Sequence, residues 1–344
     1  LWRMTYLRAV ILLVVIAVVL GLIIPATIPR IILLMPVALG MAEAMGFEEG
    51  GKGYTGLALA VGLGTFLPTF AVLTANLPAV VHVGAIESVY GIKISYAEFL
   101  IYQLPVIGVL RTVVLMVVLL ALFYQPGQPV AEVGREQMTR QQRRLAVVLL
   151  GAIAFWATDV FHGIHPAWIA MAAAVAILWP SARLISPTAF KEKVDFAPVL
   201  YVASLLSIGA ILIENGLDAE LGAFMLGFVS FHPESQLFNL YLLTGLSQLV
   251  CMISTTPAAP ILLVPIAGEL GQAADVPLMG VLMAQLVGFS SALLPYQAPP
   301  LIVLLSVCKL RFRDLVKVIM LVALATLSLG VPVAYLWWDA LGLL

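Results

Sequence analysis

Hydrophobic residues occur along the chain in long runs that are separated by short polar stretches. A helix needs about 20 consecutive apolar residues to cross roughly 30 Å of hydrocarbon. Runs of about this length, some of them rather short, predict simple crossings at residues 99–124, 145–158, 166–182, 196–213 and 315–338. The pattern therefore predicts an all-α polytopic membrane protein.

Two further runs have lengths that do not fit a simple crossing. Residues 235–268 are uncharged for 34 positions, which is too long for one crossing and too short for two crossings with a turn. We expect this run to enter the membrane, turn at residues 254–257 and leave on the same side. Residues 9–42 show the same pattern, with a Pro-rich turn at residues 25–29. Both runs are predicted to form re-entrant helical hairpins, because a turn at membrane depth must be buried in protein or face a water-filled cavity.

Two other runs are predicted to be single crossings that are broken midway. Residues 276–308 contain the stretch FSSALLPYQAPP, and residues 54–81 contain GLGTFLPT. Proline lacks a backbone N–H and fixes its own φ, so it interrupts a helix. Each half of the chain thus combines one hairpin with one broken helix.

The two halves are related by an internal repeat. Residues 25–36 align without a gap on residues 254–265, each pair being 229 positions apart. Each stretch is followed by a span that breaks at a Leu-Pro pair, at positions 67–68 in one half and 294–295 in the other. Inverted repeats with broken helices are typical of secondary transporters.

The repeat also predicts the domain organisation. Residues 1–124 form a first repeat, residues 125–144 a basic cytoplasmic linker and residues 145–344 a second repeat. The second repeat has three spans within 145–213 ahead of its hairpin, whereas the first has only residues 1–8. We therefore expect the chain to be an N-terminally truncated fragment of a longer protein; the alternative is a naturally shortened transporter.

Composition and charge agree with this threading. Hydrophobic residues make up 62% of the chain and charged residues 10%, against roughly 45–50% and 25% in soluble domains. Lys and Arg near membrane spans favour the cytoplasmic side. Between Lys193 and Lys309 there is no Lys or Arg, so the second hairpin opens outside and the first opens inside. Lys93 then lies outside, Arg30 and Arg111 lie within the membrane, and the other 14 of the 17 basic residues lie inside. We expect a multi-pass protein of the bacterial inner (plasma) membrane.

Several of these stretches resemble the divalent anion:sodium symporter family of the ion transporter superfamily. The resemblance is carried by LLMPVAL and LLVPIAG after the hairpin tips, by GTFLPTFAVLTANLP and SSALLPYQAPP in the broken spans, and by GIKISYAEFLIYQLPVIGVL. It covers nearly the whole chain. It implies substrate and sodium sites at the hairpin tips and broken helices, a homodimer, and elevator motion of a transport domain against a scaffold. The family's Ser-Asn-Thr tips read Pro-Ala-Thr and Ser-Thr-Thr in this chain.

The residues at the tips and breaks suit the binding of an anion. Half-helix N-termini carry about half a positive charge each, and hydroxyl and amide groups can donate to carboxylate or sulfate oxygens. Unwound carbonyls can hold a coupling cation. The predicted substrate-binding residues are Thr27, Arg30, Thr69, Asn76, Ser254, Thr255, Thr256 and Gln297, and the predicted cation-binding residues are Gly64, Thr65, Ser290 and Ser291. Each single hydroxyl has an alternative use as a partner of its own helix's carbonyls.

Two arginines at membrane depth need an explanation, because a charge there is costly unless it is paired or hydrated. Arg30 could bind the anion directly, bond the tip carbonyls, or extend toward water. For Arg111 we expect a structural partnership, for instance with Glu98 or a loop acid. Both Cys251 and Cys308 lie in apolar runs and should be buried and unpaired.

The leading functional hypothesis is a secondary active transporter for a small dianion such as a dicarboxylate or sulfate, coupled to a cation with sodium as the candidate. No GxxxxGK[ST] phosphate loop is present, so ATP is not the expected energy source. An intramembrane enzyme, a channel, and a carrier of another superfamily solute are the alternatives; neither HExxH nor GxSxG occurs. Asp159, His162 and His165 have a spacing that could suit a metal ion, but three such residues in an outer loop more often lie at a hydrated interface. We expect the partners to be the solute, the lipid bilayer and a second copy of the chain, with no nucleic acid and no cofactor.

Overall fold

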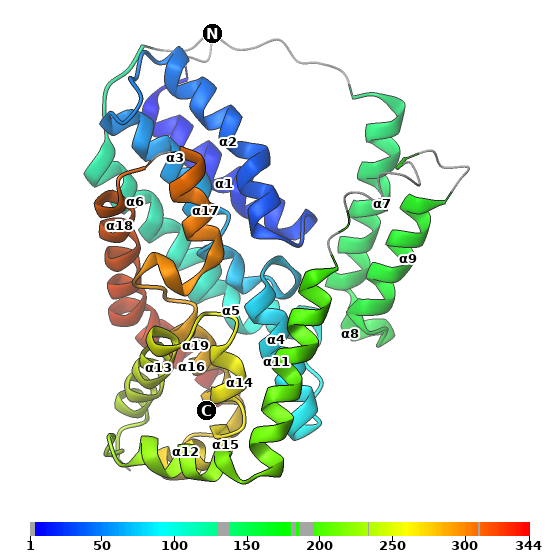
Figure 1. Ribbon diagram of the computed structural model, residues 1–344, viewed down its shortest axis with the longest axis vertical. Coiled ribbons are helices and arrows are strands. Elements are labelled where there is room, and N and C mark those ends of the chain that lie inside the picture. Colours follow the sequence, from blue (N-terminus) through cyan, green and yellow to red (C-terminus); the bar gives the residue numbers. More distant parts are fainter. Residues whose placement is uncertain are drawn as a thin grey trace.

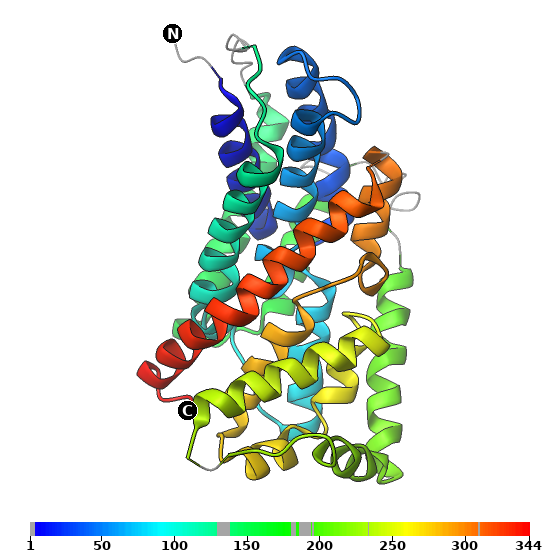
Figure 2. The ribbon, with the colours of Figure 1, turned by 90° about the vertical axis from the view of Figure 1, so that its left-hand side faces the viewer.

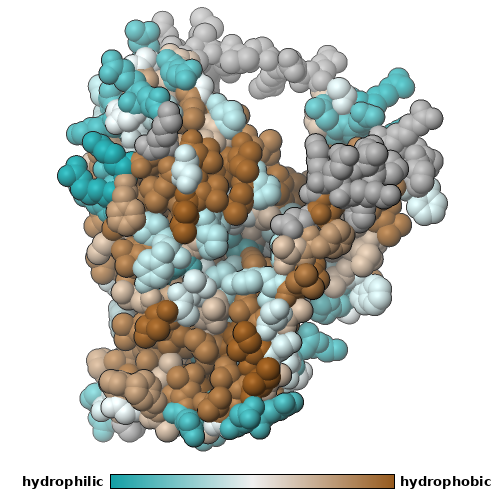
Figure 3. All heavy atoms as spheres, viewed as in Figure 1, coloured by the Kyte–Doolittle hydropathy of each residue, from teal (hydrophilic) through white to brown (hydrophobic). Residues whose placement is uncertain are grey.

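The computed structural model describes residues 4–128, 138–179, 184–185, 194, 196–232, 234–308 and 310–344. Within these ranges every regular element is helical (Figure 1). In the described part of the chain, seven helices are long and apolar enough to cross a membrane. Apolar side chains cover much of the body and hydrophilic ones gather at its two ends (Figure 3), as expected for a protein surrounded by lipid. The prediction of an all-α polytopic membrane protein is confirmed.

The chain begins with a pair of antiparallel helices, α1 (Tyr6–Ile23) and α2 (Thr27–Ala44), which contact each other. The turn between them falls at Pro25 because a residue that precedes proline is driven out of the helical region. Ile24 accordingly has φ −109° and ψ 111°. The turn reaches the middle of the body rather than its far end (Figure 1), as a re-entrant hairpin requires.

A broken helix follows the hairpin. Its first part, α3 (Lys52–Gly64), is buried from Gly53 to its end and packs on both α1 and α2. Two short 3₁₀ turns, η1 (Pro68–Ala71) and η2 (Leu73–Ala75), fill the break. The second part, α4 (Leu77–Tyr90), continues to the end of the body opposite the start of α3 (Figure 1). It ends nine residues beyond the predicted boundary at residue 81.

The next crossing is continuous and contains a π-helical segment. It consists of α5 (Tyr96–Gln103), η3 (Leu104–Leu110) and α6 (Arg111–Phe123), and together these span 28 residues. A capping box starts the helix, because the Ser95 side chain accepts from the Glu98 N–H and the Glu98 carboxylate accepts from the Ser95 N–H. Such π-helical segments are rare and often occur at functional sites.

Three helices then form a limb beside the body, namely α7 (Arg140–Ala157), α8 (Asp159–His162) and α9 (Pro166–Leu178). The limb contacts the body through α1 and α5 (Figure 1). The predicted span 145–158 is part of the longer α7, whereas the helix predicted at 166–182 ends at Leu178. Two further helices, α11 (Ala197–Glu214) and α12 (Leu217–Leu226), lead to the second half. Residues 129–137 of the predicted basic linker lie outside the described residues.

The second hairpin is built from three helices. The long arm is α13 (Gln236–Ile253), and the return arm is divided into α14 (Ala259–Leu263) and α15 (Ala267–Ala274). Residues 254–258 form the tip. A bend of 109° then separates α15 from the next helix, so the chain turns sharply at the end of the body where the hairpin opens.

The second broken helix consists of α16 (Leu278–Phe289), the 3₁₀ turn η4 (Pro295–Gln297) and α17 (Pro299–Cys308). The last crossing, seen along its length in Figure 2, joins α18 (Phe312–Ala325), the π-helical η5 (Thr326–Gly330) and α19 (Val331–Ala340). Both cysteines are buried and free, as predicted. The helix interruptions lie where the sequence placed them, whereas the re-entrant character of the two hairpins and the membrane orientation of the two halves stay predictions.

Candidate functional site

The tip of the first hairpin is bonded to the break of the first broken helix. The Thr27 hydroxyl donates to Asn76 Oδ1 at 2.7 Å, and Asn76 Nδ2 donates to the Thr69 hydroxyl at 2.9 Å. The Thr69 hydroxyl in turn donates to the carbonyl of Thr65 at 2.8 Å. Each of these four residues is at most 6% exposed. Three helix ends, those of α2, α3 and α4, thus meet in one polar network.

Arg30 lies at the centre of this network and is fully buried. Its Nη2 contacts the carbonyls of Thr65 at 2.9 Å and Ala75 at 3.0 Å, as well as the hydroxyl of Thr27 at 3.0 Å. Its Nη1 donates to the carbonyl of Ile24 at 3.2 Å. Of the three alternatives that the sequence left open for Arg30, the structure therefore shows bonding to tip and break carbonyls.

The position of Arg30 in the chain explains this geometry. The residue lies in the first turn of α2, where the positive end of the helix dipole disfavours a cation. Its side chain instead reaches across the turn to carbonyls at the ends of α1 and α3, where helix dipoles are negative. Gly21 makes room for it, because a Cβ there would lie 2.9 Å from Arg30 Nη1 and 2.7 Å from Thr69 Cγ2.

The second tip is bonded to the second break in a different way. The Thr256 N–H donates to the Gln297 carbonyl at 2.9 Å. The side chain of Gln297 is buried, and its Oε1 accepts from the N–H groups of Leu293 and Leu294, each at 2.8 Å. Gln297 Nε2 donates to Cys251 Sγ at 3.3 Å. The amide of Gln297 therefore holds the unwound segment against the hairpin.

Arg111 joins the two breaks to each other. Its Nη1 lies 3.2 Å from the Leu67 carbonyl of the first break and 3.2 Å from the Ser290 carbonyl of the second. Its Nη2 donates to the Ser291 hydroxyl at 3.0 Å, and its Nε lies 3.3 Å from the Thr326 hydroxyl. Because one guanidinium reaches both carbonyls, the two broken helices come together at the same depth.

The expected partnership of Arg111 with Glu98 is wrong. Glu98 caps the start of α5 instead, about three helical turns away along the same crossing. The sequence showed Arg111 as a charge in the middle of a span but contained no sign of its acceptors, because these are backbone carbonyls and hydroxyls from distant segments. Thr326 was also missed, since a lone threonine in an apolar run usually bonds to its own helix.

The predicted site residues fall into two groups. Thr27, Arg30, Thr65, Thr69 and Asn76 form one connected network, as described above. In the second half the side chains are less connected, and the hydroxyls of Ser254, Ser290 and Ser291 each bond a carbonyl of their own helix. Ser254 and Thr255 are half-buried at the tip, so their hydroxyl groups face a less enclosed environment than that of Thr256.

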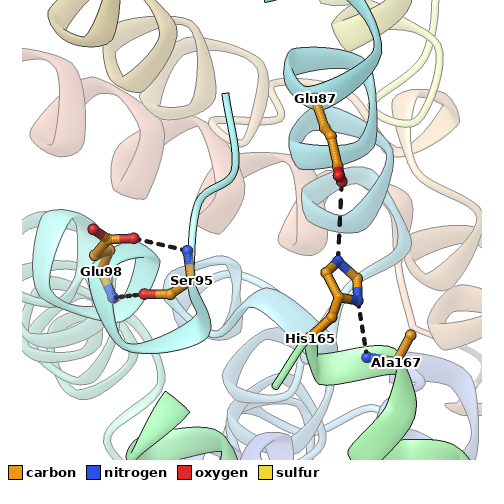
Figure 4. A network of polar contacts seen from close by, with 5 residues as sticks. All are labelled: Glu87, Ser95, Glu98, His165 and Ala167. Carbon is orange, nitrogen blue, oxygen red and sulfur yellow. Dashed lines mark hydrogen bonds and ion pairs between the residues drawn. The ribbon is translucent and has the colours of Figure 1, made fainter. Parts of the chain in front are cut away.

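The candidate metal ligands serve other purposes. The Asp159 carboxylate accepts from the N–H groups of Tyr96 and Ala97 at the start of α5. His165 lies 3.9 Å from Glu87 and accepts from the Ala167 N–H at 3.3 Å (Figure 4). Within the described ranges no group of three or more His, Cys, Asp or Glu side chains is placed to hold a metal ion.

Two matches to known proteins each cover almost the whole chain. The model of a family described as the sodium:sulfate symporter transmembrane region matches residues 3–344. A protein of Cupriavidus necator described as a membrane protein is 23% identical to this chain over 349 residues, which is 97% of this chain and 68% of the relative.

Proposed function

Because the chain belongs to the family of the sodium:sulfate symporter transmembrane region, an anion transporter family, we propose that it is a secondary transporter that binds a small dianion between the two hairpin tips. A dicarboxylate or sulfate fits the proposal. One observation carries it. The breaks of both broken helices are each held by a buried arginine, and all the acceptors described for these two side chains are carbonyl or hydroxyl oxygens.

The charge of this region supports a dianion. Arginine remains protonated in proteins, so Arg30 and Arg111 bring two positive charges into the middle of the membrane. Within the described part of the chain neither forms an ion pair with a carboxylate. Burying an unpaired charge costs several kcal/mol. A bound dianion would neutralise both charges, and a neutral solute would not.

The tips offer donors for such an anion. Thr255 and Ser254 are half-buried at the second tip, and Pro25 and Ala26 are exposed at the first. The first turn of α2 lies beside Pro25 and Ala26, and N–H groups at a helix N-terminus bind oxyanions without any side chain. At the second tip the N–H groups of Ala259 and Ile261 already donate to the carbonyls of Thr255 and Ala258. The Nε of Arg30 is buried and has no acceptor among the described residues, so the protein does not fully compensate the charge of this side chain.

Transport requires the site to open alternately to the two sides. We propose that the two hairpins and the inner ends of α3, α4, α16 and α17 move together against the rest of the protein, in the elevator manner. The networks described above support this motion, since they tie each tip to a break and so favour displacement as one unit. Two copies of the chain would form the working homodimer, in the bacterial inner membrane.

The proposal is tested by transport of radiolabelled sulfate and succinate into proteoliposomes of the full chain. We expect saturable uptake that is accelerated by unlabelled dianion on the opposite side, as a carrier requires. Monovalent analogues such as acetate should compete weakly. Uptake that rises linearly with concentration would indicate a channel, and the absence of any dianion uptake or counterflow would refute the proposal.

A further inference from the structure

The two buried arginines occupy the positions at which a coupling cation would be expected. We infer that Arg30 and Arg111 are resident cations at the two breaks, so that binding of the anion there does not require sodium. This inference rests on the proposed function. A coupling ion then has to bind elsewhere on the protein.

Arg30 occupies the first of these positions. The carbonyl of Thr65, one of the predicted cation ligands, accepts from Arg30 Nη2 at 2.9 Å. The carbonyls of Ala75 and Ile24 accept from the same guanidinium at 3.0 and 3.2 Å. Hard cations such as Na⁺ are held by the same kind of oxygen ligand, namely backbone carbonyls and hydroxyls. The guanidinium thus uses the oxygen atoms that an ion at this break would need.

Arg111 does the same at the second break. The carbonyl and hydroxyl of Ser290 lie 3.2 and 3.1 Å from its Nη1, and the Ser291 hydroxyl lies 3.0 Å from its Nη2. Both serines were predicted as cation ligands. Arg111 Nη1 also donates to the Leu67 carbonyl of the first break at 3.2 Å. Its side chain is 1% exposed, so it cannot leave these oxygens for solvent without a rearrangement of the surrounding helices.

Electrostatic repulsion disfavours a further cation beside either arginine. A sodium ion within a few ångströms of either guanidinium would meet a like charge in a region of low dielectric, where repulsion is strong. Among the described residues, the two buried carboxylates that could offset a third cation are engaged elsewhere. Asp159 accepts from backbone N–H groups of α5, and Asp314 pairs with Arg311 at 2.7 Å. An anion is therefore the only charged partner that both arginines favour.

The two arginines differ in what they are attached to. Arg30 belongs to α2, the return arm of the first hairpin, and would travel with the tip. Arg111 belongs to α6 and lies between two π-helical segments, η3 and η5, which adjoin each other. Tethered positive charges keep the site attractive to an anion in every step of transport, whereas dissociable ions would leave it.

Equilibrium binding to the purified full chain tests the inference. The dissociation constants of sulfate and succinate are measured by calorimetry in sodium chloride and in choline chloride at equal ionic strength. We expect the two values to agree within about twofold. A dianion that binds at least tenfold more tightly in sodium would overturn the inference and leave the proposed function intact. Absence of dianion binding in both salts would instead refute the proposed function.

Substitution of each arginine gives a second measurement. Arg30→Met and Arg111→Met should weaken dianion binding in choline at least tenfold, whereas Arg30→Lys, which keeps the charge, should weaken it less. Arg311→Met removes an arginine that is more than half exposed and serves as the control, with no change expected. Size-exclusion profiles confirm that each variant is folded. Methionine variants that are folded and bind with unchanged affinity would overturn the inference.

Discussion

The hydroxyl of Thr27 donates a hydrogen bond of 2.7 Å to the side-chain oxygen of Asn76, 49 positions further along the chain. Thr27 is the first residue of α2, and Asn76 is the residue immediately before α4. The bond therefore ties the tip of the first hairpin to the break of the first broken helix. Since Asn76 also donates to Thr69, the three side chains hold the inner ends of α2, α3 and α4 in one arrangement.

Removing the Thr27 hydroxyl should loosen this arrangement. Thr27→Val keeps the shape of the side chain and leaves the buried Asn76 oxygen without its donor. A lost hydrogen bond of this kind costs about 1–1.5 kcal/mol, or roughly 5- to 10-fold in affinity. We expect the apparent KM for the dianion to rise by this factor in proteoliposome uptake, with little change in the maximal rate.

The matched control is Thr158→Val. The hydrogen bonds described for the Thr158 hydroxyl go to the carbonyls of Ala154 and Phe155 in α7 of the limb. Its removal should leave the KM unchanged. Equal effects of the two substitutions would show that the Thr27 bond has no special connection with the substrate.

Two substitutions of Gln297 distinguish its effect on stability, through hydrogen bonds, from an electrostatic effect on binding of the anion. Gln297→Leu would leave the N–H groups of Leu293 and Leu294 without their buried acceptor, at a cost of about 1–3 kcal/mol each. We expect a lower thermal unfolding temperature in detergent. Gln297→Glu keeps an acceptor for both N–H groups and should restore most of the stability, but its negative charge should lower the affinity for the dianion.

The test compares the unfolding temperature and the dianion affinity of these two variants. A glutamate variant that is stable and binds the dianion as the unmodified protein does would place Gln297 outside the anion's electrostatic reach. A leucine variant of unchanged stability would contradict the hydrogen bonds of Gln297 Oε1 themselves.

A close helix contact in the second half depends on one glycine. A Cβ on Gly288 of α16 would lie 2.4 Å from the Thr244 carbonyl and 2.6 Å from the Ser247 Cβ of α13. Because the first of these is a backbone atom, one of the helices must move. Gly288→Ala should therefore destabilise the protein by about 1–3 kcal/mol, as overpacking does. Thermal unfolding in detergent measures the effect.

Gly245 of α13 is the appropriate control, since no heavy atom lies within 4 Å of a Cβ placed there. In an open helical position Gly→Ala is favourable by about 0.5–1 kcal/mol. Gly245→Ala should consequently be neutral or slightly stabilising. Similar losses of stability in both variants would mean that the contact between α13 and α16 is not the cause.

The sequence predicted the helices and their interruptions well because both follow from local chemistry. The prolines at positions 25, 68 and 295 fall at interruptions, where the missing N–H and the fixed φ of proline disfavour a continuous helix, although Pro36 is accommodated inside α2. The length of an apolar run limits how the chain can cross lipid. The membrane-spanning pattern could therefore be derived without knowledge of the tertiary structure. The ends of the broken helices were less accurate, because α4 continues beyond the apolar run to the left-handed residue Gly91.

The partners of the two buried arginines could not be predicted in this way. Arg30 was identified as a candidate because it lies three positions from Thr27, but its contacts with Thr65 and Ala75 span 35 and 45 positions. Arg111 contacts Ser290 across 179 positions. Carbonyl acceptors leave no trace in residue identity, so sequence patterns cannot reveal which segments supply them. Charge pairing with an acid was the natural expectation, and for Arg111 it was wrong.

The opposite orientation of the two hairpins remains a prediction, and the structure suggests how to test it. The two hairpins open at opposite ends of the body, with α1 and α2 at one end and α13 and α15 at the other (Figure 1). Between Lys193 and Lys309 the sequence has no Lys or Arg, and this absence favours the outside for the second end. Single cysteines can report which end is accessible from which side.

We expect a cysteine in place of Lys93 to react with a membrane-impermeant thiol reagent from outside intact cells, and a cysteine in place of Arg143 to react only after the membrane is opened. Lys93 follows α4, and Arg143 is an exposed residue in the first turns of α7. Background labelling should be low, because Cys251 and Cys308 are buried. If both positions are labelled from the same side, the chain crosses the membrane an even number of times between residues 93 and 143. The two hairpins would then open on the same face, and an arrangement in which tips from opposite leaflets enclose one anion would be untenable.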